Sequence, residues 1–189
     1  MTDYSDLPPG WFPDKDIETY QTIVSGYQNA IMVEVGVWLG RSLCSIMPIA
    51  IKHNIKVFAV DDWSGGTDKI VLENIKGVAN PYESFQDNLR GRGYLDKIQI
   101  IKMDSVEAAA TFGGKTVDIL MIDANHSYDS VHKDIIAWKS RIREDGVMLG
   151  HDWNLDSVKN AVRDTVGEPD ETIGQIWIKR GWKKHEPII

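Results

Sequence analysis

The segment VEVGVWLGRS, residues 33–42, contains two glycines four positions apart, directly after a short apolar run. The run 31–35 predicts a strand, and the residues from Gly40 onward predict a helix. A glycine turn between a strand and a helix lets backbone N–H groups approach a ligand closely. The third glycine of a G-x-G-x-x-G dinucleotide fingerprint is missing. Glu34 places a carboxylate beside the turn, which suits a cationic or amine-bearing ligand better than a phosphate.

Apolar runs and amphipathic segments alternate along the rest of the chain. The runs that predict strands are 31–35, 57–60, 98–103, 117–122 and 147–150. The segments that predict helices are 40–53, 81–92, 105–112, 127–143 and 156–166, after a first helix that begins at Asp14. Strands rich in Val, Ile and Met are typical of a sheet that helices cover on both faces. The alternation predicts an α/β fold with a doubly wound, mainly parallel sheet, and residues 171–180 add an antiparallel edge.

Length and composition bound the class of protein. The 189 residues predict a single domain, 1–189, with an N-terminal arm and helix over 1–30. The net charge of −7 argues against a nucleic-acid partner, and a single cysteine, Cys44, excludes an internal disulfide and a cysteine-built zinc site. The acidic N-terminus and the short apolar runs predict a cytoplasmic protein with no membrane partner. Trp11 and Phe12 could serve either the core or a homo-oligomer interface.

Acids and other candidate site residues follow four successive predicted strands. Because the carboxyl ends of parallel strands meet at one edge of the sheet, we expect these side chains to share one site. They are Asp61, Asp62 and Trp63 after the second strand, Asp104 and Ser105 after the third, Asp123 and His126 after the fourth, and His151 and Asp152 after the fifth.

These features together resemble the class I S-adenosylmethionine-dependent methyltransferases. The pattern E-x-G-x-x-x-G-x-S at 34–42 resembles their motif I. The segment DANHSY, 123–128, resembles the D-x-x-H-x-Y signature of a branch that includes macrocin-type and rhamnosyl O-methyltransferases and the cephalosporin-hydroxylase-like proteins. The segment DGVMLGHDW, 145–153, resembles the last strand element of that branch. The resemblance spans residues 31–153 and implies a Rossmann-like sheet and O-methylation of a sugar or small-molecule hydroxyl.

The resemblance also implies where S-adenosylmethionine binds. In that family the acid after the second strand accepts hydrogen bonds from the ribose hydroxyls. The acid after the third strand, with the backbone that follows it, reads the adenine edge. The donor-binding residues expected on this basis are Glu34, Gly36, Val37, Ser42, Asp61, Asp62, Trp63, Asp104, Ser105 and Asp123.

A hydroxyl acceptor is too weakly acidic at neutral pH to react without a base or a metal. Metal-dependent relatives hold Mg²⁺ with acids at the fourth and fifth strand ends, which implies Asp123, His151 and Asp152 as ligands of Mg²⁺ or Mn²⁺. An imidazole at position 151 departs from the oxygen ligands that Mg²⁺ prefers. A metal-free site is the alternative, and the expected catalytic residues are Asp123, His126 and His151. Structural roles also stay open, with His126 capping a helix and His151 satisfied by backbone.

Three further questions stay open from the sequence. Residues 62–81 form a long connection, which predicts either a lid that orders over the donor or an unstructured insertion. Two alternative functions also stay open, that of a nicotinamide-dependent oxidoreductase and that of a non-catalytic donor-binding module. The acceptor, a small molecule or a glycan, has no recognisable motif.

Overall fold

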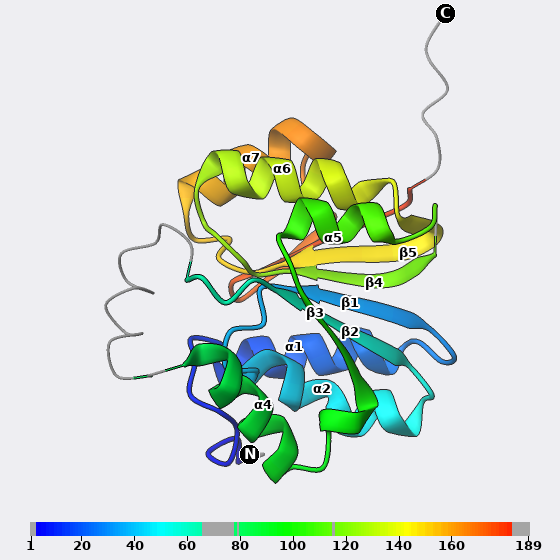
Figure 1. Cartoon of the computed structure of the whole chain (residues 1–189). Coiled ribbons are helices and arrows are strands. Elements are labelled where there is room, and N and C mark those ends of the chain that lie inside the picture. Colours follow the sequence, from blue (N-terminus) through cyan, green and yellow to red (C-terminus); the bar gives the residue numbers. More distant parts are fainter. Residues whose placement is uncertain (1–2, 66–77, 79, 115, 183–189) are drawn as a thin grey trace, which may run out of the picture.

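The computed structural model describes residues 3–65, 78, 80–114 and 116–182. In chain order the helices are α1 (Asp14–Ser25), α2 (Arg41–Lys52), α4 (Pro81–Gly91), η1 (Leu95–Lys97), α5 (Ser105–Thr111), α6 (Tyr128–Lys139) and α7 (Asp156–Val166). The strands are β1 (Ile31–Val35), β2 (Lys56–Asp61), β3 (Ile98–Lys102), β4 (Val117–Ile122), β5 (Ile142–Gly150), β6 (Glu171–Ile173) and β7 (Ile176–Arg180). The strands form one sheet in the order β3-β2-β1-β4-β5-β7-β6 (Figure 1).

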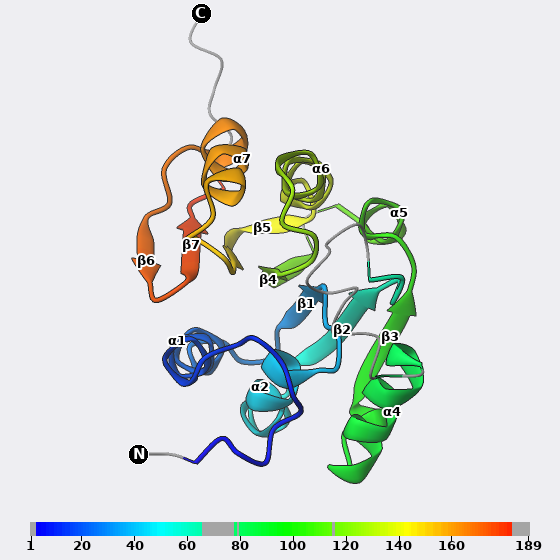
Figure 2. The same ribbon diagram turned by 90° about the vertical axis from the view of Figure 1, so that its left-hand side faces the viewer.

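The sheet confirms the predicted doubly wound topology. Strands β1 to β5 pair in parallel, whereas β7 runs antiparallel to both β5 and β6. Helices α1, α2 and α4 cover one face, and α5, α6 and α7 cover the other (Figure 2). Met32 and Met121 belong to the core on the first side, and Val33 and Leu120 to the core on the second. Both faces are therefore buried, which explains the continuous apolar strand sequences.

The boundary between the fourth crossover helix and the fifth strand differs from the prediction. Helix α6 ends at Lys139, and β5 begins at Ile142 rather than at residue 147. Ile142 continues the apolar stripe of the helix in sequence, but in the fold it is buried and pairs with Val117 of β4. The pairing with β4, rather than the helical periodicity of the sequence, therefore determines the structure of this segment.

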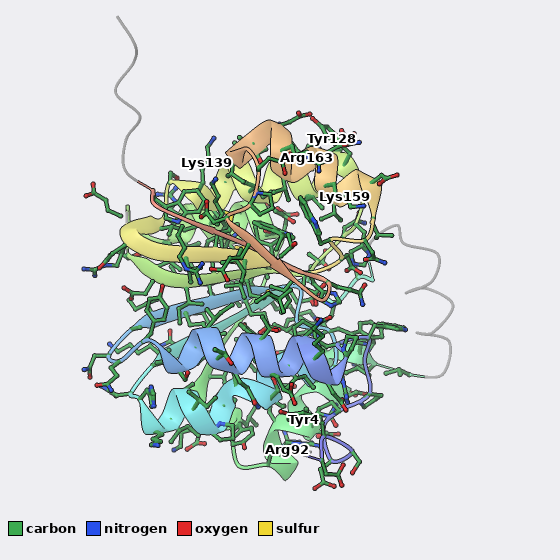
Figure 3. The ribbon with its side chains drawn as sticks, turned by 180° about the vertical axis from the view of Figure 1, so that it is seen from behind. Tyr4, Arg92, Tyr128, Lys139, Lys159 and Arg163 are labelled. Atoms are coloured by element: carbon green, nitrogen blue, oxygen red, sulfur yellow. The ribbon has the colours of Figure 1, made fainter. Side chains whose placement is uncertain are left out.

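The N-terminal arm is held against the body of the protein. Arg41 donates through Nε to the carbonyl of Phe12 at 2.9 Å and through Nη1 to that of Pro8 at 3.2 Å. Arg92, just beyond α4, donates to the carbonyl of Asp6. Figure 3 shows Arg92 and Tyr4 of the arm at the same end of the molecule. These contacts fix the backbone of the arm before it enters α1.

Two further predictions concern the connection 62–81 and the absence of a membrane-spanning helix. Most of the predicted lid, 62–81, lies outside the described residues. Within the described ranges, no helix combines the length and the apolar character that a membrane crossing needs.

Candidate active site

A cavity of about 870 Å³ lies at the carboxyl ends of the parallel strands. The expected site residues that line it are Gly36, Val37, Ser42, Asp61, Asp62, Asp104, Ser105, Asp123, His126, His151 and Asp152. Glu34 and Trp63 do not line it. The fold therefore brings together all but two of the residues that the sequence singled out.

The glycine turn after β1 is packed against the end of β4. Gly36 has a φ of +83°, and a Cβ added there would lie 2.2 Å from the carbonyl oxygen of Asp123. Asp61 shapes the same turn, because its Oδ2 accepts from the amides of Val37 at 3.0 Å and Trp38 at 2.9 Å. Its Oδ1 accepts from the amide of Trp63 at 2.7 Å. Asp61 therefore lines the cavity and also holds the turn, a second role that the sequence did not reveal.

The structure corrects the expectation that the Glu34 carboxylate faces a cationic ligand. The side chain is fully buried beneath the cavity. The Ser42 hydroxyl donates to Oε1 at 2.5 Å, and the Tyr20 hydroxyl donates to Oε2 at 2.8 Å. Burial raises the pKa of Glu34 to about 8, despite these two hydrogen bonds. Glu34 therefore supports Ser42, which does line the cavity, and does not reach a ligand itself.

Glu34→Gln should change how stability depends on pH. The unfolded chain ionises Glu34 near its ordinary pKa of 4.5, whereas the folded protein keeps it protonated up to about pH 8. The folded state therefore binds more protons in this window, and the free energy of unfolding falls as pH rises, by at most about 1.4 kcal/mol per pH unit. Glutamine resembles the protonated acid and removes this dependence. Urea denaturation across the window should show the stability of the wild type falling relative to the variant, and parallel curves would contradict the assignment.

Trp63 also lies elsewhere than expected. Its ring packs on Tyr82 and Phe85, with centroid distances of 4.7 and 5.1 Å, and only 7% of the residue is exposed. Its Nε1 donates to the carbonyl of Trp38 at 2.9 Å. The tryptophan therefore belongs to the core under α4, and its hydrogen bond to Trp38 supports the glycine turn. The prediction that it contacts the donor is corrected.

Two aspartates lie near the end of the third strand, and sequence reasoning missed the second of them, Asp134. Asp104 caps α5, because its Oδ1 accepts from the amides of Val106 and Glu107. Asp134 of α6 lines the cavity nearby, is 6% exposed and hydrogen-bonds Ser105. Burial raises the pKa of Asp134 to about 6. The signal was available in the sequence, since Asp134 is a carboxylate beside the apolar stripe of its helix.

A cluster of carboxylates and imidazoles occupies the ends of β4 and β5. His126 Nε2 lies 2.8 Å from Asp152 Oδ2, and His151 Nδ1 lies 3.2 Å from the same oxygen. Asp152 has a φ of +59°, a left-handed conformation that costs a non-glycine residue about 1–3 kcal/mol. Burial alone would raise the pKa of Asp152, but the hydrogen bonds from the two histidines hold it well below its usual range. Asp152 is therefore ionised at neutral pH.

His151 lines the cavity but is almost fully buried, and acids surround its ring. Its Nε2 lies 3.0 Å from Asp16 Oδ2, its ring centroid lies 4.7 Å from that of Phe12, and 5% of the residue is exposed. Burial opposes its charge, yet Asp123, Asp152 and Asp16 together raise its pKa to about 9. Both ring nitrogens of His151 therefore lie within 3.2 Å of a carboxylate oxygen, from Asp16 on one side and Asp152 on the other. The contacts of His151 favour a structural role in the cluster, and its expected roles as a metal ligand and in catalysis stay predictions.

Asp16 is the second residue that sequence reasoning missed. It lies in the first turn of α1, where acids are ordinarily solvent-exposed partners of the helix dipole, but only 1% of it is exposed. Its Oδ1 accepts from the amide of Gln175 at 3.1 Å. Asp16 therefore links α1, the β6–β7 turn and His151. No sequence signal distinguishes it from a surface acid.

Three groups of the cluster could hold a metal ion. One ligand atom from each of Asp123, His126 and Asp152 lies within 4.8 Å of the others. His126 takes the place that the sequence assigned to His151. Two carboxylates and one imidazole suit ions such as Mn²⁺ or Fe²⁺ better than Mg²⁺, which prefers oxygen ligands throughout.

The sequence of residues 33–153, almost two thirds of the chain, matches the profile of a family described as a methyltransferase domain. The chain belongs to this methyltransferase-domain family. It is an S-adenosylmethionine-dependent methyltransferase, and the acids at the strand ends that its sequence singled out line the expected donor cavity.

Solved structures share the fold of this methyltransferase. The O-methyltransferase NovP superposes with a TM-score of 0.69 at 20% identity, over 88% of this chain and 80% of NovP. Cofactor-bound Rv0187 from MTB superposes with a TM-score of 0.69 at 14% identity, over 94% and 84% of the two chains. The S-adenosylmethionine-dependent O-methyltransferase TM0748 from Thermotoga maritima gives 0.67 at 15% identity, over 95% and 69%. No curated protein matches the sequence.

Proposed function

We propose that this methyltransferase transfers the methyl group of S-adenosylmethionine to a hydroxyl oxygen of a small molecule or glycan, with a divalent metal held by Asp123, His126 and Asp152. One observation carries the proposal. A single cavity joins the acids expected to bind the donor to this cluster of candidate metal ligands. The proposal includes a cytoplasmic location, no nucleic-acid or membrane partner, and the option of a homo-oligomer.

The donor is proposed to follow the strand ends across the cavity. Asp61 and Asp62 lie where the ribose would bind, and residues 103–106 line the part of the cavity expected to hold the purine. The glycine turn offers a close backbone approach for the methionine portion. Methyl transfer forms a bond from the acceptor oxygen to the methyl carbon as the carbon–sulfur bond breaks, so the two reactants must be aligned.

The acceptor hydroxyl must also lose its proton. A bound divalent ion lowers the pKa of a hydroxyl that coordinates it. The chain itself contributes an ionised Asp152, whose orientation is fixed by His151 and, through His151, by Asp16. A metal-free alternative also has support, because the 2.8 Å contact between His126 and Asp152 would orient His126 as a general base. Activity that survives exhaustive chelation would favour this alternative.

Calorimetry with S-adenosylhomocysteine tests the donor assignment. The wild type should bind S-adenosylhomocysteine and should not bind NAD, because the glycine turn lacks the dinucleotide fingerprint. No heat with S-adenosylhomocysteine would overturn the proposal.

Asp61→Ala should weaken that binding by about 1–3 kcal/mol, the cost of one lost hydrogen-bonding group. The loss includes the indirect effect of releasing the amides of Val37 and Trp38. Asp87→Ala is a matched control, because Asp87 is exposed on α4 and pairs with Arg90. Unchanged affinity in Asp61→Ala would remove Asp61 from the donor site.

A further inference from the structure

We infer that this methyltransferase binds an uncharged, ring-shaped acceptor whose flat face stacks on the indole of Trp11. The inference rests on the proposed function and adds the class of acceptor. The shared chemistry is a flat ring face, which either an aromatic ring or a pyranose can present to an indole.

Trp11 lies beside the donor turn, and the residue that follows it in the chain packs near the candidate metal ligands. Its ring centroid is 6.2 Å from that of Trp38, which belongs to the glycine turn. The next residue, Phe12, packs on His151, which lies 3.2 Å from Asp152. Trp11 also lines the cavity. A ring against this indole would therefore lie beside the position where its hydroxyl has to react.

The indole is exposed although its backbone is held in place. Trp11 is 53% exposed, whereas Phe12 is 3% exposed. Arg41 binds the carbonyls of Phe12 and Pro8, on either side of Trp11 in sequence. An indole on an ordered backbone loses little conformational entropy when a ligand covers it. The exposed apolar surface is therefore suited to recognition.

A second exposed apolar side chain lines the same cavity. Leu155 is 36% exposed and lines the cavity, and its amide donates to the carbonyl of Asp152 at 2.9 Å. Gln175 also lines the cavity, and its amide donates to Asp16. Trp11, Leu155 and Gln175 form an uncharged wall, which we call the acceptor wall.

The acceptor wall has no cation to pair with an acidic acceptor. Of the described residues that line the cavity, Arg41 and Lys133 carry the long basic side chains. Arg41 is already engaged by the arm, through two carbonyls and Asp14. Lys133 lies on α6 beside Asp134, at the end of the cavity expected to hold the purine. A carboxylate on the acceptor would therefore be disfavoured, because it would enter a cavity in which the lining aspartates outnumber these basic side chains; they are Asp61, Asp62, Asp104, Asp123, Asp134 and Asp152.

The test uses the whole protein saturated with S-adenosylhomocysteine. The probes are catechol and methyl rhamnopyranoside, each compared with a carboxylated counterpart, 3,4-dihydroxybenzoate and a methyl glucuronide. Ligand-observed NMR should detect binding of at least one neutral probe, and weaker binding of its carboxylated counterpart. The probe that binds distinguishes an aromatic ring from a sugar.

Trp11→Ala should weaken the binding of that neutral probe about three- to tenfold, as expected for loss of a stacked ring. Trp11→Phe should retain most of the affinity, because a flat ring remains. Ile51→Ala is the matched control, since Ile51 is 48% exposed on α2 and does not line the cavity. Affinity for S-adenosylhomocysteine should be the same in all these variants.

Three results would overturn the inference: no binding of either neutral probe, equal binding in Trp11→Ala, or tighter binding of the carboxylated probes. A change of oligomeric state in Trp11→Ala with ring binding intact would assign the indole to an interface instead. Failure of the wild type to bind S-adenosylhomocysteine would overturn the proposed function, so the two failures are distinguishable.

Discussion

Asp152→Ala is expected to slow methyl transfer by a factor on the order of 10² to 10⁴, the contribution typical of a group that handles a reacting proton. It should leave the affinity for S-adenosylhomocysteine unchanged. Asp152 lies just beyond β5 and contacts His126 and His151, whereas Asp61, Asp62 and Asp104, which are expected to bind the ribose and the purine, lie at the ends of β2 and β3. The substitution removes one of the three candidate metal ligands, so Mn²⁺ affinity should fall together with turnover.

Turnover can be measured as formation of S-adenosylhomocysteine, and Mn²⁺ binding by electron paramagnetic resonance without any acceptor. Asp156→Ala is a matched control, because Asp156 is exposed at the start of α7 and pairs with Lys159. Thermal melting of both variants shows whether each is folded. Full turnover in Asp152→Ala would exclude Asp152 from the reaction, and joint loss of turnover and donor affinity would indicate a structural role.

Gly36→Ala should have the largest effect on stability. A Cβ at this position would lie 2.2 Å from the carbonyl oxygen of Asp123 and 2.5 Å from Cα of Ala124, both backbone atoms. The left-handed φ of +83° adds a conformational cost. Together these costs amount to about 2–6 kcal/mol, from an unfavourable backbone conformation of about 1–3 and overpacking of about 1–3.

Chemical denaturation measures that loss, and S-adenosylhomocysteine binding should weaken in the same variant because the turn has to move. Gly91→Ala is the control, since a Cβ there would meet nothing within 4 Å and Gly91 ends helix α4. It should be neutral or slightly stabilising, by at most about 1 kcal/mol. Equal stability of Gly36→Ala and the wild type would show that the turn does not pack on β4 as described.

The alternation of strands and helices along the chain and the position of the cavity were predictable from sequence because both depend on local patterns. Continuous apolar runs predict strands buried on both faces, and the residues after them must lie at one edge of a parallel sheet. Asp61, Asp104 and Asp123 line the cavity for this reason. The start of β5 was predicted wrongly, because Ile142 fits both a helical stripe and a strand, and only pairing with Val117 decides between them.

The roles of the polar side chains required the tertiary structure. Glu34 and Ser42 are near neighbours in sequence, yet whether the carboxylate faces a ligand or the protein interior depends on Tyr20 from α1. His151 and His126 both follow predicted strands, but of the two histidines Asp16 of α1 contacts only His151, and His126 belongs to the candidate metal cluster with Asp123 and Asp152. Periodicity along one chain defines which faces of a helix or strand are buried. The charge and coordination of a buried group depend on partners from other helices and strands. A local sequence pattern carries no information on the distances between the group and those partners.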